Sequence, residues 1–379
     1  MASFLSEEHA EDSTAGSGRT SFIEHVDQAL QIGQTLTTPD ARLDRAAARI
    51  AAFSPGNIAL RALSALSDGS QLPKEDLWAA AFSLAEGMRT LFNRPETIAL
   101  LDTLYPSERV YWRSVLRYCA DGNLRSVLDE YLYQLHSETG FAPLDSGVLM
   151  SLVKRAVEAL TLRSVRYVAH ATDTERTPIA FTSGFAVRYG SELATDESGG
   201  VRMGEVRNAF NSPFAPFVLA TTSVGQEGID FHWWSHALVH WNLPSNPVDF
   251  EQREGRVNRF GGHAVRKNIA ASHWSDVLSC DGPQAWRAAM KVAETAPNEL
   301  GEFSPWWMYP GDARIERVLA QYPLSHDIAR YERLRTALTR YRLTLGQPRQ
   351  EDLIQLLAQR EKDQEDIAVI NLRAPEFPC

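Results

Sequence analysis

Apolar residues recur at three- and four-residue steps through most of the first 165 positions, which is the period of an amphipathic helix. Residues 1–20 differ, because they are rich in Ser, Glu, Asp, Thr and Gly and hold few apolar side chains. Such a segment buries too little surface to order itself. The pattern therefore predicts a disordered tail over 1–20 and a helical accessory domain over 21–165. Helices are expected at 41–53, 77–92, 109–135 and 147–162.

Short apolar runs replace the helical period near residue 165. Strands are expected at 165–170, 178–182, 217–221 and 236–241, with a helix at 203–211. Asn246, Pro247 and Asp249 then supply an N-cap, a first-position proline and a carboxylate in the first turn, which together mark a helix start. Strand, loop, strand and helix in this order predict an α/β fold with a parallel sheet over 166–275.

The helical period returns beyond residue 275, which predicts a helical C-terminal extension over 276–379. A tryptophan-rich link interrupts it at 305–309, and the chain closes with an extended run at 367–372. Helices are expected at 283–294, 325–342 and 350–362.

Length and charge narrow the class of protein. With 379 residues the chain is long enough for two or three domains, and its formal charge of −10 argues against a generally basic nucleic-acid binder. Residues 202–267 escape the acidity, with seven Lys or Arg against six Asp or Glu. Any contact with an anionic ligand is therefore expected to be local.

The cysteines and the apolar runs indicate a compartment. Cys119, Cys280 and Cys379 are scattered, without a CxxC spacing, so neither a disulfide framework nor a cysteine zinc site is indicated. The first residues are acidic and lack the apolar core of an export signal, and no apolar run reaches the length of a membrane span. We expect a cytoplasmic protein with no membrane partner.

The segment Gln-Arg-Glu-Gly-Arg-Val-Asn-Arg at 252–259 carries the strongest chemical signal. On a continuous helix, Gln252, Arg256 and Arg259 share one face, and arginine forks suit the oxygens of a polyphosphate. Gly255 costs about 1 kcal/mol in mid-helix relative to Ala, which indicates a close approach of backbone or ligand. The alternative is a solvated charged face, which is the usual meaning of an isolated arginine pair.

A second candidate segment, 221–231, precedes it along the chain. Backbone amides beside Gly228 suit a phosphate, and the hydroxyls of Thr222 and Ser223 suit the oxygens of a nucleic-acid backbone. Asp230 is placed to accept from a ribose hydroxyl. For a lone Asp, a turn or helix-cap role is the alternative.

Three histidines and a pair of adjacent tryptophans lie between these segments. His232, His236 and His240 stand four apart, but on a strand that spacing separates neighbours by about 13 Å, so no zinc site is expected. Trp233 and Trp234 are suited to stacking on bases, although packing beside a strand is the commoner role of such a pair.

Together, 222–231 and 252–259 resemble motifs V and VI of superfamily 2 helicases and translocases, which lie in the C-terminal RecA-like lobe. The expected fold is thus α/β, one RecA-like parallel-sheet lobe flanked by N- and C-terminal helical regions. The resemblance implies an arginine finger on the γ-phosphate at Arg259. The other implied roles are finger partner for Arg256, orienter of water or phosphate for Gln252, ribose-side contacts for Gly228 and Asp230, and nucleic-acid contacts for Thr222 and Ser223.

The other half of such a motor is missing from the sequence. There is no Gly-x-x-x-x-Gly-Lys-Ser/Thr loop, and Asp129-Glu130 falls inside a helical pattern where a Walker B strand would be needed. The resemblance therefore implies the C-terminal half of an ATP-dependent DNA helicase or translocase, with the Mg²⁺ of Mg·ATP held by a Walker-A-containing lobe on another chain or a missing segment. RNA in place of DNA stays open. An inert helicase-derived binding module, or a fragment of a larger protein, is the alternative.

Overall fold

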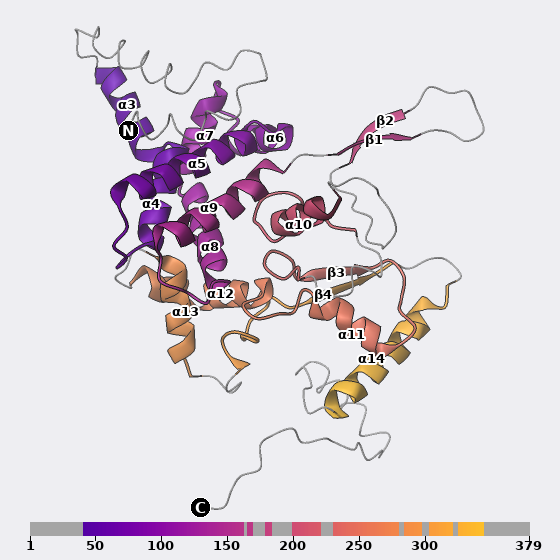
Figure 1. Ribbon diagram of the computed structural model, residues 1–379. Helices are drawn as coiled ribbons and strands as arrows, with labels where there is room; N and C mark the ends of the chain where they lie inside the picture. The colour runs from indigo at the N-terminus through magenta and orange to yellow at the C-terminus, as the bar shows by residue number, and fades with distance from the viewer. Residues whose placement is uncertain are drawn as a thin grey trace, which may run out of the picture. The chain divides into compact units, whose positions relative to one another are not determined.

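The structure is a computed structural model that describes residues 41–162, 165–169, 179–183, 199–220, 230–279, 284–297, 303–320 and 325–344. The chain divides into two compact units, Met1–Thr161 and Leu162–Cys379, and each is considered separately (Figure 1). Within the described ranges, no helix combines the length and apolar character needed to cross a bilayer.

Unit 1 is helical throughout residues 41–162, and its core lies where α5 packs against α4 and α9. Gly87 on α5 permits this approach, because a Cβ there would lie 3.1 Å from Cδ1 of Leu160 on α9. The helices are α3 (Ala41–Phe53), α4 (Pro55–Leu66), α5 (Lys74–Phe92), α6 (Pro95–Leu104), α7 (Tyr111–Ala120), α8 (Asn123–Ser137) and α9 (Ser146–Thr161).

The predicted helices at 41–53, 77–92 and 147–162 are confirmed as α3, α5 and α9. The single helix expected at 109–135 is wrong. Gly122 adopts a left-handed conformation with φ of 86° and divides that stretch into α7 and α8. The predicted tail at 1–20 lies outside the described residues.

Unit 2 contains two small sheets in its described residues. Strands β1 (Val165–Ala169) and β2 (Ile179–Ser183) pair antiparallel, whereas β3 (Ala237–His240) and β4 (Glu316–Leu319) pair parallel, from Ala237 opposite Glu316 to His240 opposite Leu319. The helices are α10 (Gly199–Phe210), α11 (Pro247–Gly255), α12 (His263–Leu278), α13 (Ala285–Thr295) and α14 (Asp327–Thr344).

Most predicted elements of unit 2 are confirmed, and a parallel sheet is present, although the described part is mainly helical. The buried strand expected at 217–221 is wrong, since residues 217–220 form no strand, and Phe217 and Val218 are 78% and 85% exposed. Pro213 and Pro216 precede the run, and proline cannot donate to a strand ladder. The elements expected at 350–362 and 367–372 lie outside the described residues.

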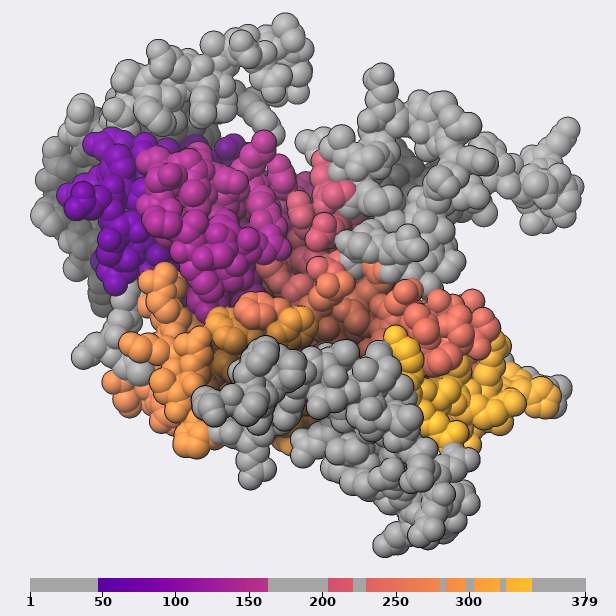
Figure 2. Space-filling view, turned by 60° about the horizontal axis from the view of Figure 1, so that its bottom comes forward, coloured from indigo at the N-terminus to yellow at the C-terminus, as the bar shows by residue number. Residues whose placement is uncertain are grey.

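Helix α14 packs against α11, as the space-filling view also shows (Figure 2, yellow against salmon). Their shared core contains Phe250 of α11 with Leu334 and Leu338 of α14, joined by Leu243. Strand β4 and helix α14 come from the stretch 276–379. That stretch therefore contributes a strand and a helix to the same core as β3 and α11.

Candidate functional site

Helix α11 carries the first part of the 252–259 segment and begins as the sequence predicts. The side-chain oxygen of Asn246 accepts a hydrogen bond from the Asp249 amide at 2.8 Å, and Pro247 occupies the first helical position. The helix ends at Gly255, however, so Arg256 is its C-cap and Arg259 lies in the following turn. The expectation that 252–259 forms one helix is therefore wrong.

The residues after Gly255 close the last turn of α11 and then pack into a neighbouring core. The Glu254 carbonyl accepts from the amides of both Val257 and Asn258 at 3.1 Å, which closes the last turn. Val257, only 3% exposed, packs against Phe210 and Phe231. The end of α11 therefore coincides with the packing of Val257 in this core.

The turn is tied to the segment that contains Asp230. The Phe231 amide donates to the Arg256 carbonyl at 2.9 Å, and the Gly262 amide donates to the Arg259 carbonyl at 3.0 Å. A Cβ at Gly262 would lie 2.9 Å from that carbonyl oxygen, so the closure requires glycine. Backbone contacts on both sides thus fix the position of Arg259.

Arg259 and Asp230 are brought together by this arrangement. Nη2 of Arg259 lies 2.9 Å from Oδ1 of Asp230, and Nε of Arg259 donates to the Gly255 carbonyl at 3.1 Å. Their side chains are 44% and 30% exposed. Two of the predicted site residues therefore form an ion pair that solvent reaches.

The structure does not place Gln252 and Arg256 together with them on one helix face. Gln252 is exposed on α11, whereas Arg256 is 8% exposed and lies within the protein. Gly255 is also not explained by tertiary contacts, since, apart from its chain neighbours and the backbone of α11, no described atom lies within 4 Å of a Cβ built there. Thr222, Ser223 and Gly228 lie outside the described residues.

Two residues that sequence reasoning missed hold the site in place. At the end of α10, Asn211 donates through Nδ2 to the Asp230 carbonyl at 2.6 Å, and its Oδ1 lies 3.5 Å from the Trp233 amide nitrogen. Asn211 is the last residue of the helix predicted at 203–211, and an asparagine at a helix end was the available signal, because its side chain readily bonds nearby backbone.

Arg266 of α12 supports the turn from the other side. It is 1% exposed and donates through Nη1 to the Gly261 carbonyl at 2.7 Å and through Nη2 to the Trp233 carbonyl. Its guanidinium lies 5.0 Å from the centroid of the Trp234 ring. These contacts, with Trp233 buried at 4% exposure, indicate packing as the role of the tryptophan pair.

The histidines near the turn are held neutral. Burial, reinforced by Arg266, Arg259 and Arg207, lowers the pKa of His232 to about 3. Burial also lowers the pKa of His263 to about 3, and Nδ1 of His263 lies 2.9 Å from Nδ1 of His236. A search of the described ranges finds no group of three or more metal-ligating side chains.

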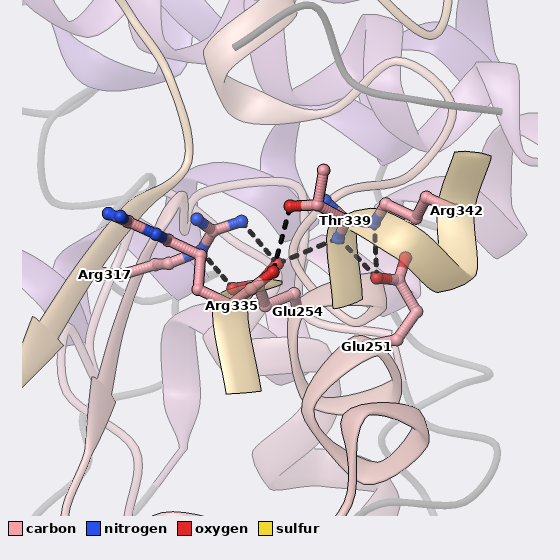
Figure 3. Close-up of polar contacts among 6 residues, drawn as sticks. All are labelled: Glu251, Glu254, Arg317, Arg335, Thr339 and Arg342. Atoms are coloured by element: carbon pink, nitrogen blue, oxygen red, sulfur yellow. Dashed lines mark hydrogen bonds and ion pairs between the residues drawn. The ribbon is translucent and has the colours of Figure 1, made fainter. Parts of the chain in front are cut away.

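A buried charge cluster lies at the C-terminal end of α11, and Figure 3 shows its members. Glu254 is 0% exposed and receives Arg317 of β4, with Nη2 to Oε2 at 3.0 Å and a second contact from Nε to Oε1. Nη2 of Arg342 of α14 lies 3.1 Å from the same Oε2, and its Nε donates to Glu251 at 2.7 Å. The motif-like segment is thereby tied to β4 and α14.

Comparison with known proteins agrees with the resemblance that the motifs indicate. Residues 202–261 match the family model of the helicase conserved C-terminal domain. The match runs through α10, β3 and α11 to the turn that carries Arg259. It supports a superfamily 2 helicase C-terminal lobe, and hence a helicase-related class for this part of the chain. No curated protein and no solved structure matches the chain.

Proposed function

We propose that the chain is the C-terminal half of an ATP-dependent superfamily 2 DNA helicase or translocase, and that it supplies an arginine finger to ATP bound by another lobe. The helicase C-terminal match over 202–261 supports this proposal. The sequence contains no phosphate-binding Walker A loop, so the complete motor requires a partner that holds Mg·ATP.

The observation that carries the proposal is that Arg259 has an accessible side chain on a well-supported backbone. Its side chain is 44% exposed, while the turn that carries it is held by the Val257 core contact and by the bond from the Phe231 amide to the Arg256 carbonyl. A rigid backbone with an accessible arginine is what transition-state stabilisation demands, because the charge is positioned before the reaction. Removing such a finger lowers the hydrolysis rate by a factor of about 10³ to 10⁵.

Asp230 has a place in the same cycle. An ion pair as exposed as Arg259 and Asp230 contributes only about 0–1 kcal/mol, so a phosphate group that carries more charge displaces the carboxylate at small cost. The released Asp230 is then available for a ribose hydroxyl. Apart from its chain neighbours and the backbone of α11, no described atom lies within 4 Å of a Cβ built at Gly255, so no described residue crowds a nucleotide at this position.

The nucleic-acid side of the proposal rests on Thr222 and Ser223, whose hydroxyls would contact the backbone of DNA. Hydroxyl contacts to a phosphate backbone position a protein without reading sequence, as a motor that moves along a strand requires. The same chemistry suits RNA, so the assay below is run with both nucleic acids. A cytoplasmic location is part of this proposal.

The test is ATP hydrolysis by the purified chain mixed with a Walker-A-containing lobe, such as one encoded beside it, with DNA, RNA or neither. Hydrolysis is expected only in the mixture, with Arg259→Ala lowering kcat on the order of 10³-fold or more. Arg287→Ala, which removes an exposed arginine from α13, is the matched control and should be neutral. Hydrolysis by this chain alone that Arg259→Ala abolishes would disprove the need for a partner lobe.

An inert helicase-derived binding module is the second candidate, and one observation favours it. Arg256, the implied partner of the finger, is 8% exposed and therefore suits a structural role. In that case the mixture shows no hydrolysis, while binding of single-stranded DNA is equal for the wild-type chain and Arg259→Ala. Fluorescence anisotropy with a labelled oligonucleotide distinguishes the two functions.

A further inference from the structure

The cluster around Glu254 has a composition that requires explanation. A carboxylate with 0% exposure loses its hydration, and such a charge persists only where ion pairs and hydrogen bonds replace water. Here, arginines from two different elements provide those bonds, and their side chains are only 17% (Arg317) and 5% (Arg342) exposed. Because both arginines are planar forks, the cluster fixes direction as well as distance.

The central residue of the cluster, Glu254, is also where the turn that carries Arg259 begins. The Glu254 carbonyl accepts from Val257 and Asn258, and the neighbouring Gly255 carbonyl accepts from Nε of Arg259. A rotation of this end of α11 therefore moves three hydrogen bonds that shape the turn. The guanidinium of Arg259 would be redirected with them.

Helix α11 does not hold its own end in place. It has nine residues, which is short for a helix that depends on internal hydrogen bonds. The side chain of Asn246 caps its first turn, and at its C-cap the Arg256 amide donates to the Glu254 carbonyl. The tertiary contacts of Phe250 and Glu254 with β4 and α14 therefore act with the Val257 core contact in holding this end of the helix.

We infer that Arg342 and Arg317 are positioning residues for the arginine finger, acting through Glu254 to fix the end of α11 and the direction in which Arg259 is presented. Arg342 lies near the end of α14 and also binds Glu251, so it holds two carboxylates of α11 at once. Helix α14 thereby helps to position the end of α11. The expected effect on ATP hydrolysis rests on the proposed function, whereas the expected effect on the position of the α11 end does not.

The first arm of the test is hydrogen–deuterium exchange of the full chain without nucleotide. Arg342→Ala should speed exchange across 247–262 on the order of tenfold while leaving α12 and α13 unchanged. Arg342→Lys, which keeps the charge but loses the fork, should fall between this variant and wild type. Arg333→Ala is the matched control, because exposed Arg333 on α14 bonds only to the Ala329 carbonyl of its own helix among the contacts described.

The second arm measures ATP hydrolysis by the same variants mixed with the Walker-A lobe. Arg342→Ala should lower kcat on the order of tenfold with an unchanged KM for ATP, and Arg342→Lys should recover part of the loss. If wild type and Arg259→Ala are equally inactive, the proposed function fails and the exchange arm alone decides the positioning role.

Three results would overturn the inference. The first is an exchange rate across 247–262 in Arg342→Ala that equals the rate in the wild-type chain. The second is an unchanged kcat in Arg342→Ala when Arg259→Ala is inactive. The third is a uniform rise in exchange over all of unit 2 in both Arg342→Ala and Arg342→Lys, because that result would make Arg342 a general stability residue.

Discussion

Arg259 is paired with Asp230 across the turn that follows α11, with Nη2 and Oδ1 2.9 Å apart. The two residues come from different candidate segments, and the bond between the Phe231 amide and the Arg256 carbonyl joins those segments. The guanidinium of Arg259 therefore lies between the Asp230 carboxylate and the Gly255 carbonyl. Substitution of Asp230 can therefore distinguish a role in stability from a role in ligand binding.

Asp230→Asn should leave stability nearly unchanged and weaken nucleotide binding. Both partners are solvent-exposed, so loss of the ion pair costs at most about 1 kcal/mol in the free energy of unfolding. If Asp230 accepts from the ribose, KM for ATP in the two-lobe mixture rises while Tm stays constant. Asp276→Asn removes another exposed carboxylate, whose Oδ2 lies 3.1 Å from Nδ1 of His273, and is the control, with no expected change in KM. An unaltered KM in Asp230→Asn would refute the ribose contact.

Gly255→Ala separates a structural need for glycine from a ligand-imposed one. Neither Gly255 nor Gly204 of α10 has a described atom within 4 Å of a built Cβ, and neither has a positive φ. Alanine at either helical position should therefore raise the free energy of unfolding by up to about 1 kcal/mol. Only Gly255→Ala should lower hydrolysis in the mixture, because only there would the methyl group meet the nucleotide. Equal activity of both variants would argue against a nucleotide beside Gly255.

The start of α11 was predictable and its end was not, for a physical reason. Asn246, Pro247 and Asp249 act within one turn, so the local sequence contains the whole signal for the start. At the end, Glu254 bonds Arg317 and Arg342, which follow it by 63 and 88 residues, and Val257 packs against Phe210 and Phe231. No local pattern encodes contacts at that separation.

Strand β4 shows the same limit. Its four residues, Glu316–Leu319, alternate between exposed and half-buried positions, and the strand forms by pairing with distant β3. Conversely, the run at 217–220 has strand composition but no partner strand in the described residues, and Phe217 is 78% exposed. Strand propensity describes how well a residue fits a sheet, and it cannot supply the neighbouring strand.

The lowered pKa of His240 should make the free energy of unfolding depend on pH. It is 3% exposed and stacks on Phe250, and burial lowers its pKa to about 4 from the ordinary 6.5. Below about pH 6.5 the unfolded chain takes up a proton that the folded chain refuses, so stability falls as the pH drops toward 4 and levels off below it. The slope for this one residue is at most about 1.4 kcal/mol per pH unit.

His240→Phe tests this prediction while keeping the stacked ring. Nε2 of His240 has no hydrogen-bond partner in the part of the chain described, so phenylalanine removes a buried polar atom without breaking a bond. Urea unfolding followed by tryptophan fluorescence should give the variant a shallower decline between pH 6.5 and pH 4. The curves of variant and wild type should run parallel above pH 7, which serves as the internal control. Equal slopes at low pH would mean that His240 is protonated in the folded chain.

Arg266→Ala should be strongly destabilising, although Arg266 lies outside both motif-like segments. The substitution leaves the Gly261 and Trp233 carbonyls without their buried donor, at about 1–3 kcal/mol each, and removes the cation from the face of Trp234. Lys267→Ala on the same helix is the control, because an exposed side chain of this kind changes stability by at most about 0.5 kcal/mol. Urea unfolding of both variants measures the difference. A loss in Arg266→Ala no greater than that of the control would mean that the Gly261 turn, and with it Arg259, is positioned by its backbone bonds alone.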